Sequence, residues 1–327
     1  MGRAWIDGHL DLAYVAASTG DLRQEPSLEC SRSLSLGGLS RGSVGIVAAT
    51  LFVEPGEEAR GKPWGYEGHD DWEGANRAAL LQIACYQQME RDGLVRIVRS
   101  RADLEVTDRL RLVILMEGAD PIRDARDAAR WHGLGVRMVG LSWAHGSRFT
   151  GGNAQPGRLT SLGRDLVTAL DELSIIHDAS HLSDASFDDL CATTTRMVVA
   201  SHSNARALMN PSERHLSDPQ VREIARRGGV VGLNLYGKFL AKDRPATLAD
   251  AVTHVEHIAQ VAGTRAISAL GSDLDGGFAP EVVPEELRYP DRYGALTDSL
   301  ATRGWSDSDC DGLASGNWLR VFRRQIP

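Results

Sequence analysis

The chain has 327 residues, of which 42% are hydrophobic and 24% charged, an ordinary composition for a globular protein. Its 36 basic and 44 acidic residues give a formal net charge of −8, which argues against a nucleic-acid-binding protein because no basic excess is available to neutralise phosphates. No apolar run approaches the roughly 20 residues of a membrane span, and the start of the chain lacks the basic and apolar segments of a signal peptide.

Continuously apolar segments alternate with helical patterns along the chain, as is typical of parallel strands covered by helices. In chain order we expect strands 5–8 and 44–53, helix 71–91, strand 112–116, helix 120–132, strand 136–143, helix 161–173, strand 175–179, helix 184–191, strand 197–200, helix 218–227, strand 230–235, helix 247–262 and strand 266–270. Residues 95–98 are a further strand candidate, and 55–68 are expected to form a long loop.

Eight strands with intervening helices fit an α/β fold of the (β/α)8 TIM-like barrel type. An open, doubly wound sheet is the alternative, but no strand is followed by a glycine-rich phosphate-binding loop. The chain becomes turn-rich after Leu274 and helical after Tyr293. We therefore expect one domain over residues 1–327, with a C-terminal helical tail at about 293–327.

Potential metal ligands stand at the carboxyl ends of five of these strands, the face at which barrel enzymes place their active sites. His9 and Asp11 are two residues apart, so their side chains point to the same side of an extended chain. The whole set comprises His9, Asp11, Glu117, His181, His202 and Asp273.

Six ligands are too many for one tetrahedral zinc ion and suit two ions that share a carboxylate. Mixed imidazole and carboxylate ligands favour Zn²⁺, with Mn²⁺ or Co²⁺ as substitutes. Taken singly, each residue has an ordinary alternative: Glu117 as a helix-terminal carboxylate, and His181 or His202 as a hydrogen-bonded buried histidine. Their joint occurrence at strand ends favours a binuclear metal site at the C-terminal face of the barrel.

Other histidines have structural interpretations. His254 and His257 lie three residues apart on a helix expected on the outer ring of the barrel, and His177 is expected to be a satisfied core histidine. The cysteines Cys30, Cys85, Cys191 and Cys310 are dispersed and form no C-x-x-C pair, which indicates a reducing cytoplasmic location.

The order of these segments resembles the membrane (renal) dipeptidase family of the amidohydrolase superfamily nearly end to end. The resemblance is carried by DGHLDL (7–12), MEG (116–118), GLGVR (133–137), DASH (178–181), SHSNAR (201–206), RHLSD (214–218), GGVVG (228–232), GSDLDG (271–276) and GNWLRV (316–321).

The resemblance implies a barrel with two zinc ions per subunit. One ion would be held by His9, Asp11 and Asp273, the other by His181 and His202, and Glu117 would bridge them. It also implies hydrolysis of dipeptides, often with a D-residue at the C-terminal position, and family members are commonly homodimers.

Three residues are expected to contact the substrate. Arg214 matches the family arginine that binds the substrate carboxylate, a role suited to a planar guanidinium; the alternative is a solvated loop arginine. Tyr236 is a candidate pocket wall. Trp143 stands where the mammalian enzymes have a histidine near the scissile group, and either His145 or Asn153 could take that place.

By this interpretation a metal-bridging hydroxide attacks the peptide carbonyl. Asp273 takes its proton and passes it to the leaving amine, with Glu117 as the second catalytic carboxylate. Two alternatives remain: an amidohydrolase acting on another small amide, lactone or ester, which the Trp143 departure suggests, and a catalytically inactive barrel used for binding.

Overall fold

The computed structural model describes residues 2–26 and 32–327, so Cys30 lies outside them. The chain divides into two compact units: unit 1 comprises Met1–Ala48 and Ala200–Phe322, and unit 2 comprises Ala49–Val199 and Arg323–Pro327. The strand β2 (Val44–Phe52) and the helix α12 (Asn317–Gln325) each run from one unit into the other. Among the described residues, no helix has both the length and the apolar character that crossing a bilayer requires.

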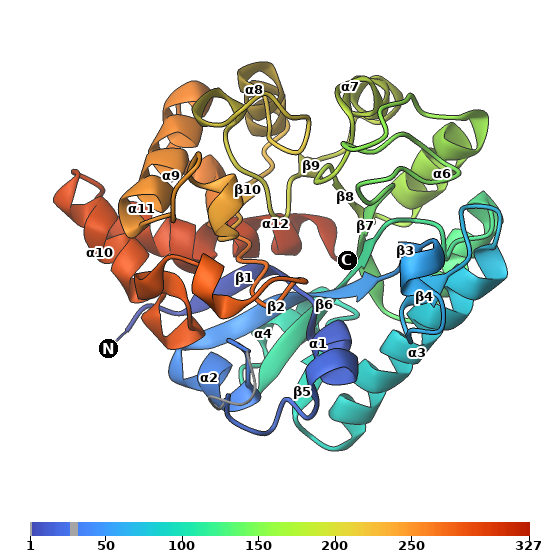
Figure 1. The fold of residues 1–327 in the computed structure, drawn as a ribbon, viewed down its shortest axis with the longest axis horizontal. Helices are drawn as coiled ribbons and strands as arrows, with labels where there is room; N and C mark the ends of the chain where they lie inside the picture. Colours follow the sequence, from blue (N-terminus) through green and yellow to red (C-terminus); the bar gives the residue numbers. More distant parts are fainter. Residues whose placement is uncertain (1, 27–31) are drawn as a thin grey trace. The chain divides into compact units, whose positions relative to one another are not determined.

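Unit 1 contains a parallel sheet with the strand order β10-β11-β1-β2; Figure 1 labels β1, β2 and β10. Its remaining strands are β1 (Trp5–Leu10), β10 (Val231–Leu233) and β11 (Ser268–Leu270). Its helices are α1 (Leu12–Thr19), α2 (Leu36–Arg41), α8 (Asp218–Arg226), α9 (Leu248–Ala262), α10 (Gly294–Thr302), α11 (Asp307–Asp311), a π-helical turn at Gly312–Gly316, and most of α12.

Unit 2 continues the parallel order from the end of β2 as β2-β6-β7-β8-β9, with β5 added on β6. Its strands are β3 (Glu54–Pro55), β4 (Gly65–Tyr66), β5 (Val95–Ile97), β6 (Leu110–Glu117), β7 (Val136–Gly140), β8 (Ile176–Asp178) and β9 (Val198–Val199). Its helices are α3 (Trp72–Arg91), α4 (Arg101–Glu105), α5 (Ala128–Gly133), α6 (Ser161–Glu172) and α7 (Asp184–Thr193).

The strand order confirms the α/β barrel prediction. Eight strands follow one another in chain order through both units, and β11 returns to pair in parallel with β1. Directly after β9, Ala200 forms a parallel bridge with Val231 of β10, which nearly closes the ring. A doubly wound sheet has a reversal in its strand order, so that alternative is wrong. The extra strand candidate at 95–98 exists as β5, beside β6 and outside the ring.

Several element boundaries differ from the expectations. The structure contains two helices that the sequence did not predict, α1 and α2. Gly37 and Gly38 lower the helix propensity of α2. That helix is stabilised at its start by the Ser35 side chain, which accepts a hydrogen bond from the Gly38 amide. The expected helix 120–132 is reduced to α5 and a preceding 3-10 turn at Ala125–Asp127, which begins with the Asp124 side chain accepting a hydrogen bond from the Arg126 amide. The expected loop 55–68 contains the short strand β4, which pairs in parallel with β3 at the start of the loop.

The carboxyl ends of β1 and β11 in unit 1 are joined by a buried carboxylate. Asp7 accepts hydrogen bonds from the Ser272 amide at 2.8 Å, the Tyr293 hydroxyl at 2.8 Å and the His9 amide at 3.2 Å. Burial raises the pKa of Asp7, and these hydrogen bonds oppose that rise. Because His9 is a candidate ligand and Ser272 directly precedes another, Asp273, this network sets the relative position of the two strand ends that carry them.

Candidate metal centre

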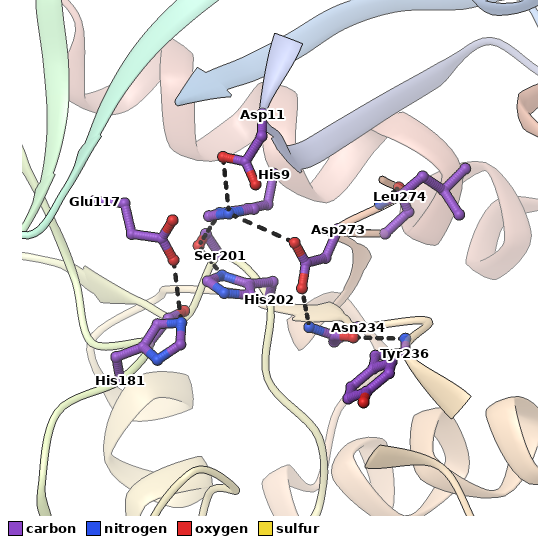
Figure 2. Close-up of polar contacts among 12 residues, drawn as sticks. His9, Asp11, Glu117, His181, Ser201, His202, Asn234, Tyr236, Asp273 and Leu274 are labelled. Atoms are coloured by element: carbon purple, nitrogen blue, oxygen red, sulfur yellow. Dashed lines mark hydrogen bonds and ion pairs between the residues drawn. The ribbon is translucent and has the colours of Figure 1, made fainter. Parts of the chain in front are cut away.

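Three candidate ligands converge within unit 1. His9 lies near the end of β1, Asp11 directly precedes α1 without a side-chain capping hydrogen bond, and Asp273 follows β11 by three residues. The His9 Nε2 atom is 4.0 Å from Asp11 Oδ1 and 4.0 Å from Asp273 Oδ1 (Figure 2). These distances are too long for hydrogen bonds. One ligand atom from each residue falls within 4.8 Å of the others, which is a spacing that fits a shared cation.

Asp273 is held so that one carboxylate oxygen faces His9. Its φ of 60° is left-handed, and its amide donates to the His9 carbonyl at 3.1 Å. Asn234, which is fully buried, donates from Nδ2 to Asp273 Oδ2 at 2.9 Å, and its own Oδ1 accepts from the Tyr236 amide at 2.7 Å. Asn234 therefore fixes Oδ2, while Oδ1 remains directed toward the histidine.

His202 lies next to His9 in the same unit. It follows β9 by three residues, is 1% exposed, and stacks on the His9 ring with a centroid separation of 3.6 Å and an interplanar angle of 30°. The hydroxyl of Ser201 lies 3.1 Å from His9 Nδ1 and 2.8 Å from His202 Nδ1. Four of the six expected ligands are thus gathered in unit 1.

Arg214 is buried rather than solvated, which overturns the alternative of a surface loop arginine. It is 5% exposed and precedes α8. Its Nη2 donates to the His202 carbonyl at 2.9 Å and its Nη1 to Ser203 Oγ at 3.2 Å, while its guanidinium lies 5.1 Å from the centroid of the Phe239 ring. The arginine is therefore hydrogen-bonded to the main chain of His202, a candidate metal ligand.

Aromatic and neutral groups surround Arg214. Burial, together with the neighbouring Arg214 charge, lowers the pKa of His215 to about 3, so this imidazole is neutral at physiological pH. Tyr236 follows β10 by three residues, is half-buried, and stacks on Phe278 at 4.7 Å. The sequence predicted Tyr236 as a wall residue, and its contact with Asn234 connects it to Asp273.

Unit 2 contributes the other two expected ligands, which contact each other. Glu117 ends β6 and His181 follows β8 by three residues; Glu117 Oε1 lies 3.0 Å from His181 Nε2 (Figure 2). His181 has a left-handed φ of 68°, and its Nδ1 lies 3.0 Å from Asn153 Oδ1. Asn153, one of two residues left open from the sequence, therefore orients His181.

Trp143 was expected to end strand 136–143, but β7 stops at Gly140 and Trp143 lies on the loop that follows, where its carbonyl accepts a hydrogen bond from the Gly146 amide in a tight turn. Its ring centroid is 5.2 Å from Phe52, 5.5 Å from His145 and 6.1 Å from His181. Trp143 thus forms an aromatic wall beside a candidate ligand. His145 uses its carbonyl to bind His69 Nε2, so it packs on Trp143 and anchors a loop.

The histidines that were given structural interpretations have structural partners. His177 Nε2 lies 2.6 Å from Asp171 Oδ1. His254 Nδ1 accepts the Ala205 amide, and His257 Nε2 lies 2.9 Å from Asp218 Oδ1, so the two do not share a partner.

Sequence reasoning missed Ser201 and Asn234. Neither side chain is charged or a typical metal ligand, and the only available signal was the position of Ser201 directly before His202.

The residues of unit 1 fit a divalent cation. His9, Asp11 and Asp273 supply one imidazole and two carboxylates, a donor set that suits Zn²⁺, Mn²⁺ or Co²⁺. Two of the three are almost fully buried, and buried carboxylates need a compensating positive charge. Asp273 and Asp11 both face an imidazole nitrogen that a cation would use.

A family model described as membrane dipeptidase (peptidase family M19) matches residues 3–326. A protein of Klebsiella pneumoniae, described as an uncharacterized protein in the pqqA 5′ region, is 33% identical over 261 residues, covering 74% of this chain and 94% of that one. Dipeptidase 3 of Macaca fascicularis is 30% identical over 267 residues, covering 76% of this chain and 52% of that one. The chain spans about half the length of the relatives named as dipeptidases.

Solved structures show the same fold. A dipeptidase described as a metallo peptidase of family M19 has a TM-score of 0.86 at 24% identity, covering 100% of this chain and 99% of that one. A metallo peptidase from Rhodobacter sphaeroides, solved with a phosphinate mimic of the dipeptide L-Ala-D-Ala, has a TM-score of 0.83 at 24% identity and covers 99% and 100% of the two chains.

Proposed function

The chain belongs to the membrane dipeptidase family, metallopeptidase family M19, and on this basis we propose that it is a zinc-dependent dipeptidase that accepts a D-residue at the C-terminal position. The observation that carries the proposal is the group of His9, Asp11 and Asp273, of which His9 and Asp11 are buried. The neighbouring structure solved with an L-Ala-D-Ala mimic supports the choice of substrate.

For the metal centre we propose two zinc ions. His9, Asp11 and Asp273 would hold one ion, His181 and His202 the other, and Glu117 would contribute to both. When bound, the ions lower the pKa of a water so that hydroxide is present near neutral pH, and they polarise the scissile carbonyl. The support is the position of all six residues at or just after the carboxyl ends of parallel strands, the face that barrel enzymes use.

The chain's own residues bind and orient the substrate and transfer a proton. Arg214 receives the substrate's C-terminal carboxylate, which restricts the enzyme to short peptides. A carboxylate oxygen of Asp273 takes the proton of the attacking water and transfers it to the nitrogen of the leaving amine as the C–N bond breaks. Asn234 holds Oδ2 of that carboxylate during the transfer. Trp143 in unit 2 and Tyr236 in unit 1 are each proposed to contact the substrate.

The test is hydrolysis of a panel of L,L- and L,D-dipeptides by zinc-restored protein, with an Asp273→Asn variant beside wild type. Asp243→Asn is a matched control, because Asp243 is exposed and shares a left-handed φ, 52° against 60°. We expect amino acid release by wild type and Asp243→Asn, and a loss of at least ~100-fold for Asp273→Asn. Absence of turnover on every dipeptide contradicts the proposed function.

The second candidate function uses the same metal centre to hydrolyse a different bond, that of a lactone, an ester or a small amide other than a dipeptide. The observation that favours it is the Trp143 ring, whose centroid lies 6.1 Å from that of the candidate ligand His181, at a position where the family resemblance implies a histidine. Lactone turnover well above dipeptide turnover on the same sample would favour this candidate. The third alternative, an inactive binding barrel, requires that zinc-loaded protein hydrolyse none of these substrates.

We further propose that the chain is a single domain, a homodimer and cytoplasmic. The continuity of β2 and α12 through both units supports a single domain, which predicts one unfolding transition by calorimetry. Light scattering tests the dimer, and fractionation of the source cells tests the location, which dispersed cysteines favour.

A further inference from the structure

One hydroxyl lies against two candidate histidine ligands. Ser201 is fully buried, and its Oγ is 3.1 Å from His9 Nδ1 and 2.8 Å from His202 Nδ1 (Figure 2). In both rings it is therefore Nδ1 that faces the serine. The opposite nitrogen of His9, Nε2, faces the carboxylates of Asp11 and Asp273.

The chemistry of imidazole decides which group donates. A neutral ring carries one proton, so a ring that binds a cation through the Nε2 lone pair carries its proton on Nδ1. Each Nδ1–H then needs an acceptor. A serine hydroxyl has two lone pairs and can therefore accept a hydrogen bond from each of the two rings. If the hydroxyl donated to either Nδ1 instead, that ring would carry its proton on Nε2 and could not bind the cation.

We propose that Ser201 is a positioning residue that accepts hydrogen bonds from the Nδ1–H groups of His9 and His202 and so holds both rings in the metal-binding tautomer. The inference rests on the metal centre proposed above, in which the two histidines serve different ions. One hydroxyl therefore orients one histidine ligand of each ion. Partners of this kind typically change metal affinity by about 10- to 100-fold when they are removed.

The chain offers a matched control in Asn153, which serves a single ligand. Its Oδ1 lies 3.0 Å from His181 Nδ1, so it orients the ligand of one ion only. Removal of the Asn153 side chain should weaken the binding of one ion, whereas removal of the Ser201 hydroxyl should weaken the binding of both ions. This difference separates a shared partner from a general loss of structure.

The experiment titrates metal-free protein with Zn²⁺ against a chromophoric chelator, comparing wild type with Ser201→Ala and Asn153→Ala. We expect two zinc ions in wild type, about 10- to 100-fold weaker binding of both in Ser201→Ala, and weaker binding of one in Asn153→Ala. Unchanged binding of either ion in Ser201→Ala overturns the inference. Failure of wild type to bind zinc contradicts the proposed metal centre instead, so the two failures are distinguishable.

A second measurement needs no variant. Two-bond ¹H–¹⁵N spectra of histidine side chains report which nitrogen carries the proton in metal-free wild type, at a pH where the rings are neutral. We expect the Nδ1–H tautomer for both His9 and His202. The Nε2–H tautomer in either ring overturns the inference even if Ser201→Ala does not fold.

Discussion

Arg214 offers a direct test of how the substrate is held. The perturbation is Arg214→Met, which retains an unbranched, mostly apolar side chain and removes the guanidinium. Arg206→Met is the matched control, because Arg206 is also an arginine of this region that binds the main chain, donating from Nε to the His215 carbonyl at 2.8 Å. Each protein is assayed on a dipeptide and on the same dipeptide with its C-terminal carboxylate converted to an amide.

The expected magnitude follows from the contacts. A hydrogen bond to a charged group contributes about 1.5–3 kcal/mol, which corresponds to roughly 10- to 150-fold in kcat/KM. Arg214→Met should therefore lose that factor on the dipeptide and little on the amide. The variant also loses the bonds from Arg214 to the His202 carbonyl and Ser203 Oγ, which should lower the free energy of unfolding by about 1–3 kcal/mol per unsatisfied buried group.

The assay is initial-rate release of the free amine, with zinc content measured on every sample. The selective loss on the carboxylate substrate is the signature of a carboxylate contact, because a general disturbance of the site slows both substrates. Equal losses on the dipeptide and the amide would refute the role given to Arg214. So would a selective loss of the same size in Arg206→Met.

Three further predictions concern metal, pH and packing. Removal of divalent ions with a chelator should abolish hydrolysis, and added Zn²⁺ should restore it; full activity after verified metal removal would contradict the metal centre. Because the pKa of His215 is about 3 in the folded protein and its ordinary value is 6.5, the unfolded chain binds the extra proton between these values. The contribution of His215 to the free energy of unfolding is therefore complete above pH 6.5 and is lost as the pH falls below that value. His215→Gln should reduce the slope of the unfolding free energy against pH by about 1.4 kcal/mol per pH unit, measured by urea unfolding between pH 6 and 4.5. Equal slopes for wild type and variant would contradict this prediction. Gly8→Ala would push a methyl group into the Trp318 indole, whose Nε1 donates to the Leu270 carbonyl at 2.8 Å, and should destabilise the protein by about 1–3 kcal/mol in the same assay, an effect that unchanged stability would exclude.

The sequence alone determined the fold class and the candidate ligands, because both depend on local pattern. Apolar, β-branched runs predicted parallel strands, and His9, Glu117 and Asp273 stood where those strands end. In a barrel all such ends share one face, so strand position translates into spatial convergence without knowledge of any single contact. The chemistry of the side chains then indicated a divalent cation.

Only the tertiary structure decided which neutral groups orient those ligands. Ser201 meets His9 across 192 residues of sequence, and Asn234 meets Asp273 across 39. A hydroxyl or an amide carries no pattern that marks it as the partner of an imidazole or a carboxylate, and its role depends on where the backbone places it. Burial of Arg214 likewise depends on packing against Phe239 and the His202 main chain, which no local signal encodes.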